Sequence, residues 1–362
     1  MKIGIVTQPL YANYGGILQN YALQQILKDL GHHPVTIDYM PSLSFKRYLL
    51  YVGKCFLLFL SPTKRHPIKP YKHFLERPIN IDAFVRNNIS LTKTIPKYSK
   101  RLLRKNGIEA IIVGSDQVWR YSYNSHYLED MYLAFAEGFN CVKIAFSASF
   151  GKEDWDYPAD RAAVVRKLIK QFKTVSVRET SGIRLCKEYL ATPAVFTLDP
   201  TLLLPASVYE SLCKSQQSRT EPYLAACILD LDQEKKGFIE AFAASNGWIV
   251  KSMTVTDAGC PVEEWLTTIK DSEYVITDSY HGSLFSILFK KQFMTFVNEG
   301  RGADRFVSLF SHLGIEDRML RSLSDNLSTK APIDYDKVEP LLNSLRESSI
   351  SFLIEALKRD EH

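Results

Sequence analysis

The chain has 362 residues, of which 46% are hydrophobic and 23% are charged, and its formal net charge is +5. This length allows two domains of ordinary size, and the composition is that of a soluble globular protein. The charge is too small to predict nucleic-acid binding, and no recognition helix or RNP-like aromatic pattern accompanies it. No apolar run reaches about 18 residues, so we expect no transmembrane helix.

The six cysteines are scattered along the chain, and no two of them have the CxxC spacing of a zinc or redox site. Isolated thiols suit a reducing compartment. The amino terminus lacks the hydrophobic region of a signal peptide. We therefore expect a cytoplasmic protein without a bound metal or cofactor.

The first half of the chain alternates short apolar strands with helices. The strands are predicted at 3–7, 35–39, 108–113, 143–148, 175–178 and 195–198, and the helices at 17–30, 159–172 and 180–189. A loop containing Asn13, Tyr14, Gly15 and Gly16 precedes the first helix. Free N–H groups at a helix N-terminus favour phosphate, so this loop is a candidate site for phosphate or an acceptor. A simple tight turn explains the segment equally well, and the Gly-x-Gly-x-x-Gly spacing that would indicate NAD is absent.

Residues 41–78 differ in character from their surroundings. They carry positive charges without an acidic residue between Asp38 and Glu76, around an apolar run at 48–60. The run is too short to span a bilayer. It suits a flap over a cleft or a contact with the membrane surface, and the alternative is a helical insertion packed on the first domain.

The second half repeats a strand followed by a helix. The strands are predicted at 223–229, 248–253, 274–277 and 293–297, and the helices at 233–244, 262–270, 283–289 and 304–313. This alternation predicts a parallel sheet with helices on both faces. We therefore expect an N-terminal α/β domain over 1–205, a Rossmann-like domain over 206–335, and a last segment, 336–362, whose helix can cross back to the first domain.

Two such domains form a cleft between the carboxyl ends of their strands, where ligands bind. The polar residues after predicted strands are Gly114, Ser115, Asp116, Arg178 and the turn 277–282. In that turn, Ser279 is a good N-cap, Gly282 allows close approach of a ligand, and His281 can exchange protons. The alternative for this turn is a capped turn with a hydrogen-bonded structural histidine.

Several of these stretches are also recognisable motifs. They are Asn13-Tyr-Gly-Gly with Gln19-Asn-Tyr-Ala-Leu, Val113-Gly-Ser-Asp-Gln-Val-Trp119, Ser147-Ala-Ser-Phe-Gly151, Ser176-Val-Arg-Glu179, Leu198-Asp-Pro-Thr201, Ile276-Thr-Asp-Ser-Tyr-His-Gly282, and Arg301 with Arg305. Through these motifs nearly the whole chain resembles the polysaccharide pyruvyl transferase family. The resemblance implies a fold like that of GT-B glycosyltransferases and transfer of a pyruvyl group from phosphoenolpyruvate to two sugar hydroxyls.

The resemblance also suggests roles for the singled-out residues. His281 is the candidate acid/base, because a ketal synthesis both delivers and removes protons. Phosphoenolpyruvate carries a phosphate and a carboxylate, which arginine pairs with well. The candidate donor-binding residues are Arg178, Ser279, Tyr280, Gly282, Arg301 and Arg305. The candidate acceptor- or phosphate-binding residues are Asn13, Tyr14, Gly15, Gly16, Gly114, Ser115 and Asp116.

One position departs from the family pattern. Ketal-forming members resemble one another in an Arg-x-His sequence at the central turn, whereas this chain has Ser279-Tyr280-His281. Either Arg301 or Arg305 replaces the missing arginine, or the donor is held differently, or the donor is not phosphoenolpyruvate. The expected acceptor is a bacterial surface glycan or its lipid-linked precursor, at the inner face of the membrane. The alternatives are a glycosyltransferase that uses a nucleotide sugar and a non-catalytic sugar-binding component of a glycan assembly complex.

Overall fold

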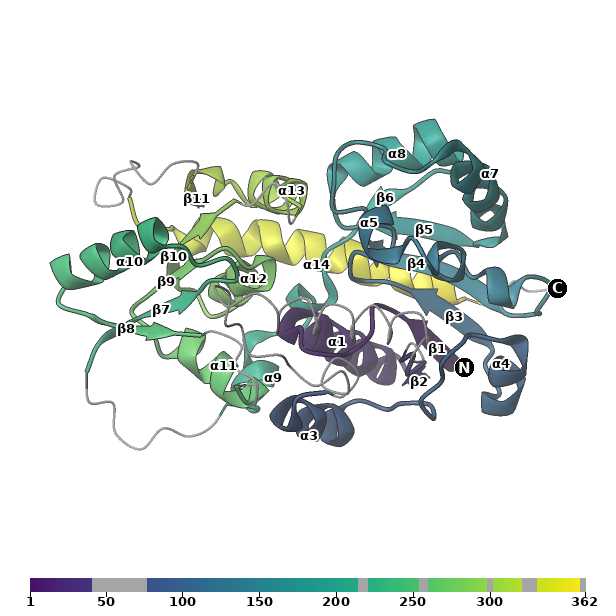
Figure 1. Cartoon of the computed structure of the whole chain (residues 1–362), viewed down its shortest axis with the longest axis horizontal. Coiled ribbons are helices and arrows are strands. Elements are labelled where there is room, and N and C mark those ends of the chain that lie inside the picture. The colour runs from purple at the N-terminus through teal and green to yellow at the C-terminus, as the bar shows by residue number, and fades with distance from the viewer. Residues whose placement is uncertain (41–76, 214–220, 254–259, 298–301, 321–330, 359–362) are drawn as a thin grey trace, which may run out of the picture.

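The computed structural model describes residues 1–40, 77–213, 221–253, 260–297, 302–320 and 331–358. They form two parallel sheets, each surrounded by helices and lying side by side (Figure 1). This confirms the α/β class and the two Rossmann-like sheets predicted from the sequence. The insertion at 41–78, with its predicted flap or membrane role, lies outside the described residues except for its last two positions.

The first sheet has the strand order β2-β1-β3-β4-β5-β6, and its neighbouring strands are all parallel. Its strands are β1 (Lys2–Val6), β2 (His33–Thr36), β3 (Ala110–Val113), β4 (Val142–Ala148), β5 (Thr174–Val177) and β6 (Val195–Phe196). The central strand β3, with the sequence AIIV, is buried along its whole length. Strands covered on both faces need such continuous apolar runs, which is why the sequence pattern located them.

The second sheet has the order β11-β10-β9-β7-β8 and is also parallel. Its strands are β7 (Tyr223–Cys227), β8 (Ile249–Ser252), β9 (Tyr274–Thr277), β10 (Gln292–Phe296) and β11 (Met319–Leu320). In each sheet the strand order reverses between two neighbouring parallel strands, β1 and β3 in the first sheet and β7 and β9 in the second. Ligands of open α/β sheets bind beyond the carboxyl ends of strands at such switch points.

Helices of both domains connect these strands and cover them. They are α1 (Tyr14–Asp29), α3 (Ile79–Asn88), α4 (Lys100–Asn106), α5 (Tyr121–Asn124), α6 (Leu128–Met131), α7 (Ala159–Leu168), α8 (Thr180–Leu190), α9 (Ala206–Glu210), α10 (Gln233–Ser245), α11 (Val262–Lys270), α12 (Tyr280–Leu288), α13 (Asp304–Leu313) and α14 (Tyr335–Leu357). Two predicted starts are wrong by three residues: α1 begins at Tyr14 and α12 at Tyr280. Among the described residues, no helix is both long enough and apolar enough to cross a membrane.

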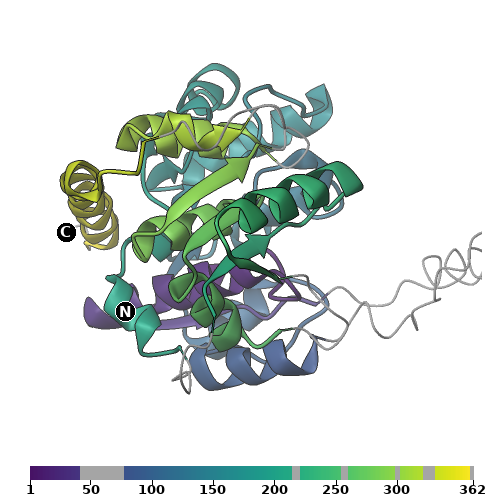
Figure 2. The same ribbon diagram turned by 90° about the vertical axis from the view of Figure 1, so that its left-hand side faces the viewer.

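The two domains share an apolar interface. One core cluster contains residues of both sheets, and α1 contacts α12 across the boundary. Helix α14 begins beside the second domain, where the Tyr335 hydroxyl donates to the carbonyl of Lys291. It ends beside the first, where the Ser349 hydroxyl accepts the Leu198 N–H at 3.0 Å. Figure 2 shows this yellow helix nearly end-on, along one side of the molecule. These contacts fix the relative position of the two switch points.

Candidate active site

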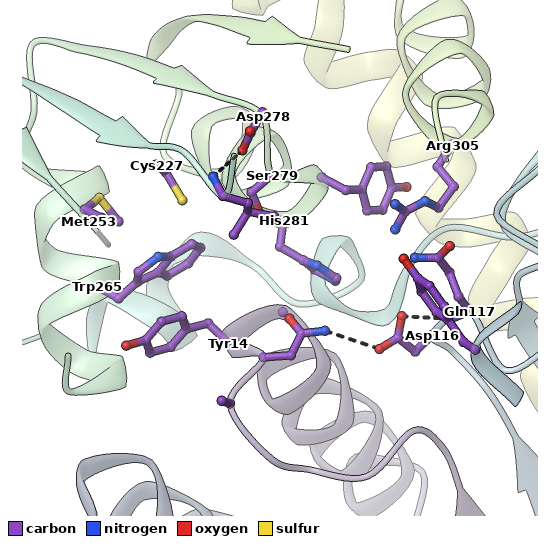
Figure 3. Close-up of a pocket in the computed structure, with 16 residues that line it drawn as sticks. Tyr14, Asp116, Gln117, Cys227, Met253, Trp265, Asp278, Ser279, His281 and Arg305 are labelled. Carbon is purple, nitrogen blue, oxygen red and sulfur yellow. Dashed lines mark hydrogen bonds between the residues drawn. The ribbon is translucent and has the colours of Figure 1, made fainter. Parts of the chain in front are cut away.

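A pocket of about 300 Å³ lies where the switch points of the two sheets face each other (Figure 3). Its walls come from the segments that follow β1, β3, β7 and β9, together with α11, α13 and the end of β8. The first domain contributes Ala12, Asn13, Tyr14, Gly15, Asp116, Gln117 and Tyr123. The second contributes Cys227, Leu229, Met253, Trp265, Asp278, Ser279, Tyr280, His281 and Arg305. The pocket therefore collects strand-end residues of both domains.

His281 enters the middle of this pocket from the first turn of α12. The hydroxyl of Ser279 accepts the N–H of Gly282 at 3.3 Å and caps the helix, which is why α12 begins before the predicted position. The histidine consequently lies on a helix rather than in a turn. It is only 5% exposed, and helical backbone fixes where its ring can point.

The ring of His281 packs against the first turn of α1. A Cβ on Gly15 would lie 1.8 Å from Nδ1 of His281, so glycine is needed for the imidazole to fit. The segment predicted as a loop thus includes the start of a helix. The side chain of Asn13 makes no capping hydrogen bond, and the first turn has no acidic residue. The positive end of α1 is therefore left to act on the pocket.

Four small residues predicted to contact a ligand are absent from the pocket lining: Gly16, Gly114, Ser115 and Gly282. A Cβ on Gly282 would lie 2.3 Å from Oγ1 of Thr277, so this glycine serves close packing on β9 rather than ligand approach. Gly114 has φ +130° and its backbone lies against the carbonyl of Phe146. Ser115 is 1% exposed, and its hydroxyl donates to Oδ2 of the buried Asp199 at 3.3 Å. Packing thus uses the same small residues that ligand approach would, and the ligand contacts of these residues stay predictions.

Asp199, which follows β6, contacts several of the polar residues beneath the pocket. It is fully buried and accepts hydrogen bonds from Nη1 of Arg178 at 2.7 Å, Oγ of Ser115 at 3.3 Å and the N–H of Thr201 at 3.1 Å. Its Oδ2 also lies 3.5 Å from Nε2 of His281. Burial alone would raise the pKa of Asp199, but His281 and Arg178 outweigh it and hold that pKa below its usual range.

Arg178 follows β5 as predicted, but it is fully buried and does not line the pocket. Besides Asp199, it donates through Nη2 to Oδ1 of Asp116 at 3.3 Å. Burial opposes its charge, yet the two carboxylates outweigh burial and raise the pKa of the guanidinium. The structure thus gives Arg178 two protein carboxylates to hold. Arg178 meets the pocket through lining residues, among them Asp116 and Tyr280, and its predicted direct contact with the donor stays a prediction.

The arginine that does line the pocket is Arg305, in the first turn of α13. Its guanidinium carbon lies 4.9 Å from the ring centroid of Tyr280, and it is 5% exposed. Burial and the nearby charge of Arg178 lower the pKa of Arg305 to about 10. A buried guanidinium beside a second one is stabilised by an anion. The other predicted arginine, Arg301, lies outside the described residues.

The opposite end of the pocket is aromatic (Figure 3). Tyr14 stacks on Trp265 with ring centroids 5.6 Å apart, and its hydroxyl donates to the carbonyl of Cys260 at 2.8 Å. Cys227 and Met253 complete this end. Within the described ranges, no group of three His, Cys, Asp or Glu side chains could hold a metal ion.

Sequence reasoning did not single out several of these residues, among them Asp199 and Trp265. Asp199 left a signal, because it follows a strand within the Leu198-Asp-Pro-Thr201 motif. Trp265 left none, since an aromatic residue on the apolar face of a helix normally indicates core packing.

Two parallel α/β domains thus place a histidine and a buried guanidinium in one pocket at their facing switch points. The polysaccharide pyruvyl transferase family model matches residues 13–300, so the chain belongs to this family and is a transferase. No curated protein matches its sequence. Solved structures of similar shape include a glycosyltransferase from Rickettsia africae ESF-5, with 10% identity over 99% of both chains and a TM-score of 0.49. Another is the UDP complex of S. aureus MnaA, with 9% identity over 99% of this chain and 98% of that one and a TM-score of 0.49. Such distant likeness carries no argument about the donor.

Proposed function

We propose that this protein transfers the pyruvyl group of phosphoenolpyruvate to two hydroxyls of a sugar, forming a cyclic ketal on a surface polysaccharide or its lipid-linked precursor. The observation that carries the proposal is that His281 and Arg305 line one pocket, into which the N-terminal ends of α1 and α12 also face. A proton-transfer group and several fixed positive partial charges thus surround one small volume.

This arrangement suits the donor's charges. Phosphoenolpyruvate brings a phosphate and a carboxylate into the pocket, and Arg305 can pair with either in the two-pronged geometry of guanidinium. Arg305 also stands next to Tyr280, the residue after Ser279. It therefore offers a guanidinium near the position where related ketal-forming enzymes carry their arginine. Helix N-termini stabilise the negative charge that grows on the departing phosphate.

His281 supplies the proton chemistry in this proposal. The methylene carbon of the donor must gain a proton, and each attacking hydroxyl must lose one. An imidazole can perform both tasks near neutral pH. Oδ2 of the buried Asp199 lies 3.5 Å from Nε2 of His281, and the attraction of this carboxylate helps to orient the ring.

A thermal shift experiment tests the donor. Phosphoenolpyruvate should raise the melting temperature of the purified protein in a concentration-dependent way, because a ligand that binds only the native state stabilises it. Transfer of label from [¹⁴C]phosphoenolpyruvate into an acid-labile product should then follow, with membranes of source cells that lack the gene as the acceptor supply. Stabilisation by nucleotide sugars alone would instead favour a glycosyltransferase. Glycan binding without any product would favour a sugar-binding component.

A further inference from the structure

Four side chains form a continuous polar chain under the pocket. His281 lies 3.5 Å from Asp199, Asp199 accepts from Arg178 at 2.7 Å, and Arg178 donates to Asp116 at 3.3 Å. The two middle members are fully buried. The two end members, His281 and Asp116, both line the pocket, and they come from different domains. This row of four side chains thus presents one imidazole and one carboxylate to the same pocket.

We propose that Asp116 is a second catalytic residue, which takes the proton of the attacking sugar hydroxyl while His281 delivers a proton to the methylene carbon of the donor. This inference rests on the proposed function and adds a base to it. In the view of Figure 3, the ring of His281 points toward the side of the pocket where Asp116 lies.

The two oxygens of Asp116 are held unequally. Oδ1 accepts the N–H of Gln117 at 2.7 Å and the Nη2 proton of Arg178 at 3.3 Å. Among the described residues, Oδ2 has only a long contact, 3.5 Å, with Nδ2 of Asn13. It also lies over Gly16, where a Cβ would stand 3.2 Å away. One oxygen therefore anchors the carboxylate, while the other lies where a substrate hydroxyl can approach.

The charged groups around Asp116 favour this use. Arg178 acts on it from the end of β5 and Arg305 from α13. Their positive charges attract the carboxylate and help to hold it at the pocket wall. A purely structural carboxylate needs neither a place in the pocket wall nor a weakly held oxygen.

The proton balance of ketal formation closes with these two groups. In the first step a sugar oxygen bonds to C2 of phosphoenolpyruvate, its proton moves to Asp116, and C3 takes a proton from the imidazolium of His281. In the second step the bond between C2 and the phosphate oxygen breaks, and Asp116 returns its proton to the departing phosphate. The second hydroxyl then bonds to C2 and gives its proton to His281. Both groups end in their starting states.

Three variants test the assignment in the label-transfer assay described above. Asp116→Asn keeps the shape and the acceptor for Gln117 but removes the base, so kcat should fall about 10²- to 10⁴-fold. The KM for phosphoenolpyruvate should change less than kcat. Asp278→Asn is the matched control. That carboxylate also lines the pocket, but its oxygens accept the backbone N–H groups of Leu229 and Asp230. This variant should lose much less kcat than Asp116→Asn.

Asp116→Glu separates catalysis from packing. A longer carboxylate keeps a base, so it should be at least tenfold faster than Asp116→Asn if proton transfer is the role. If Asp116 only supports Arg178, the isosteric asparagine should be the better substitute. Asp116→Asn with wild-type kcat, or a glutamate variant slower than the asparagine one, would overturn the proposal. A wild-type protein that transfers no label would instead count against the proposed function itself.

Discussion

Oδ2 of Asp199 lies 3.5 Å from Nε2 of His281, and this contact joins the first domain to the second directly beneath the pocket. The imidazole is thus oriented by a carboxylate from the opposite domain. The Nδ1 side of the ring packs against Gly15, which is also in the first domain. The candidate acid/base residue therefore has its correct surroundings only when the two domains are packed together.

The lowered pKa of Asp199 predicts how stability depends on pH. Because the folded pKa is below the unfolded value, the stabilisation is complete above the unfolded pKa, about 3.9, and is lost as the pH falls toward the folded value. Asp199→Asn leaves Arg178 with one carboxylate fewer and should cost about 3–5 kcal/mol at pH 7. The difference from wild type should shrink below about pH 4, by about 1.4 kcal/mol per pH unit. Urea unfolding at several pH values measures it, and a difference independent of pH would contradict the assignment.

Replacement of His281 should separate catalysis from stability. His281→Asn keeps some hydrogen bonding but cannot transfer protons, so kcat should fall about 10²- to 10⁴-fold. The variant should fold and should still gain stability from phosphoenolpyruvate. Melting temperature and kcat are measured on the same preparation. A destabilised variant with full activity per folded molecule would make His281 a structural histidine.

Gly15 tests the fit of the imidazole on α1. Alanine suits helical backbone better than glycine, so the main unfavourable effect of Gly15→Ala is its Cβ, placed 1.8 Å from Nδ1 of His281. We expect a displaced ring and at least a tenfold loss of kcat. Gly237→Ala is the matched control, since a Cβ there meets nothing within 4 Å in helix α10. It should raise stability by about 0.5–1 kcal/mol and leave activity unchanged. Equal activities of the two variants would refute the tight fit.

The sequence predicted the framework better than the contacts. Strand Tyr274–Thr277 and helix Val262–Lys270 lie where the apolar periodicity placed them. Buried parallel strands and amphipathic helices leave strong local patterns. The convergence of His281, Asp116 and the first loop was also predictable, because the carboxyl ends of parallel strands meet at one edge.

Other features depend on contacts between distant segments and left no local pattern. The start of α12 was predicted from its apolar run, whereas the cap at Ser279 sets it. A sequence shows that Arg178 is charged but not that Asp199 and Asp116 hold it away from the pocket. Likewise, Gly282 looks like a ligand-binding glycine, although Thr277 is what approaches it. In the last two cases, contacts between residues from different segments of the chain decide the role of the residue.

The two arginines near Tyr280 should respond differently to the same substitution. Arg305 lines the pocket. Arg305→Lys should keep the positive charge but lose the planar guanidinium, whose paired N–H groups can bind two oxygens of one anion. We expect the KM for phosphoenolpyruvate to rise about tenfold and the donor-induced thermal shift to shrink, with little change in the melting temperature of the free protein.

Arg178→Lys acts on a fully buried guanidinium that holds both Asp199 and Asp116. An ammonium cannot reach both carboxylates in the same geometry, so the free protein should melt at a lower temperature. Its remaining folded fraction should still bind phosphoenolpyruvate, because Arg305 and the helix N-termini are unchanged. Thermal scans of both variants with and without the donor measure these effects. If Arg178→Lys abolished the donor-induced shift while the free protein kept its melting temperature, Arg178 would be the donor ligand and Arg305 the supporting residue.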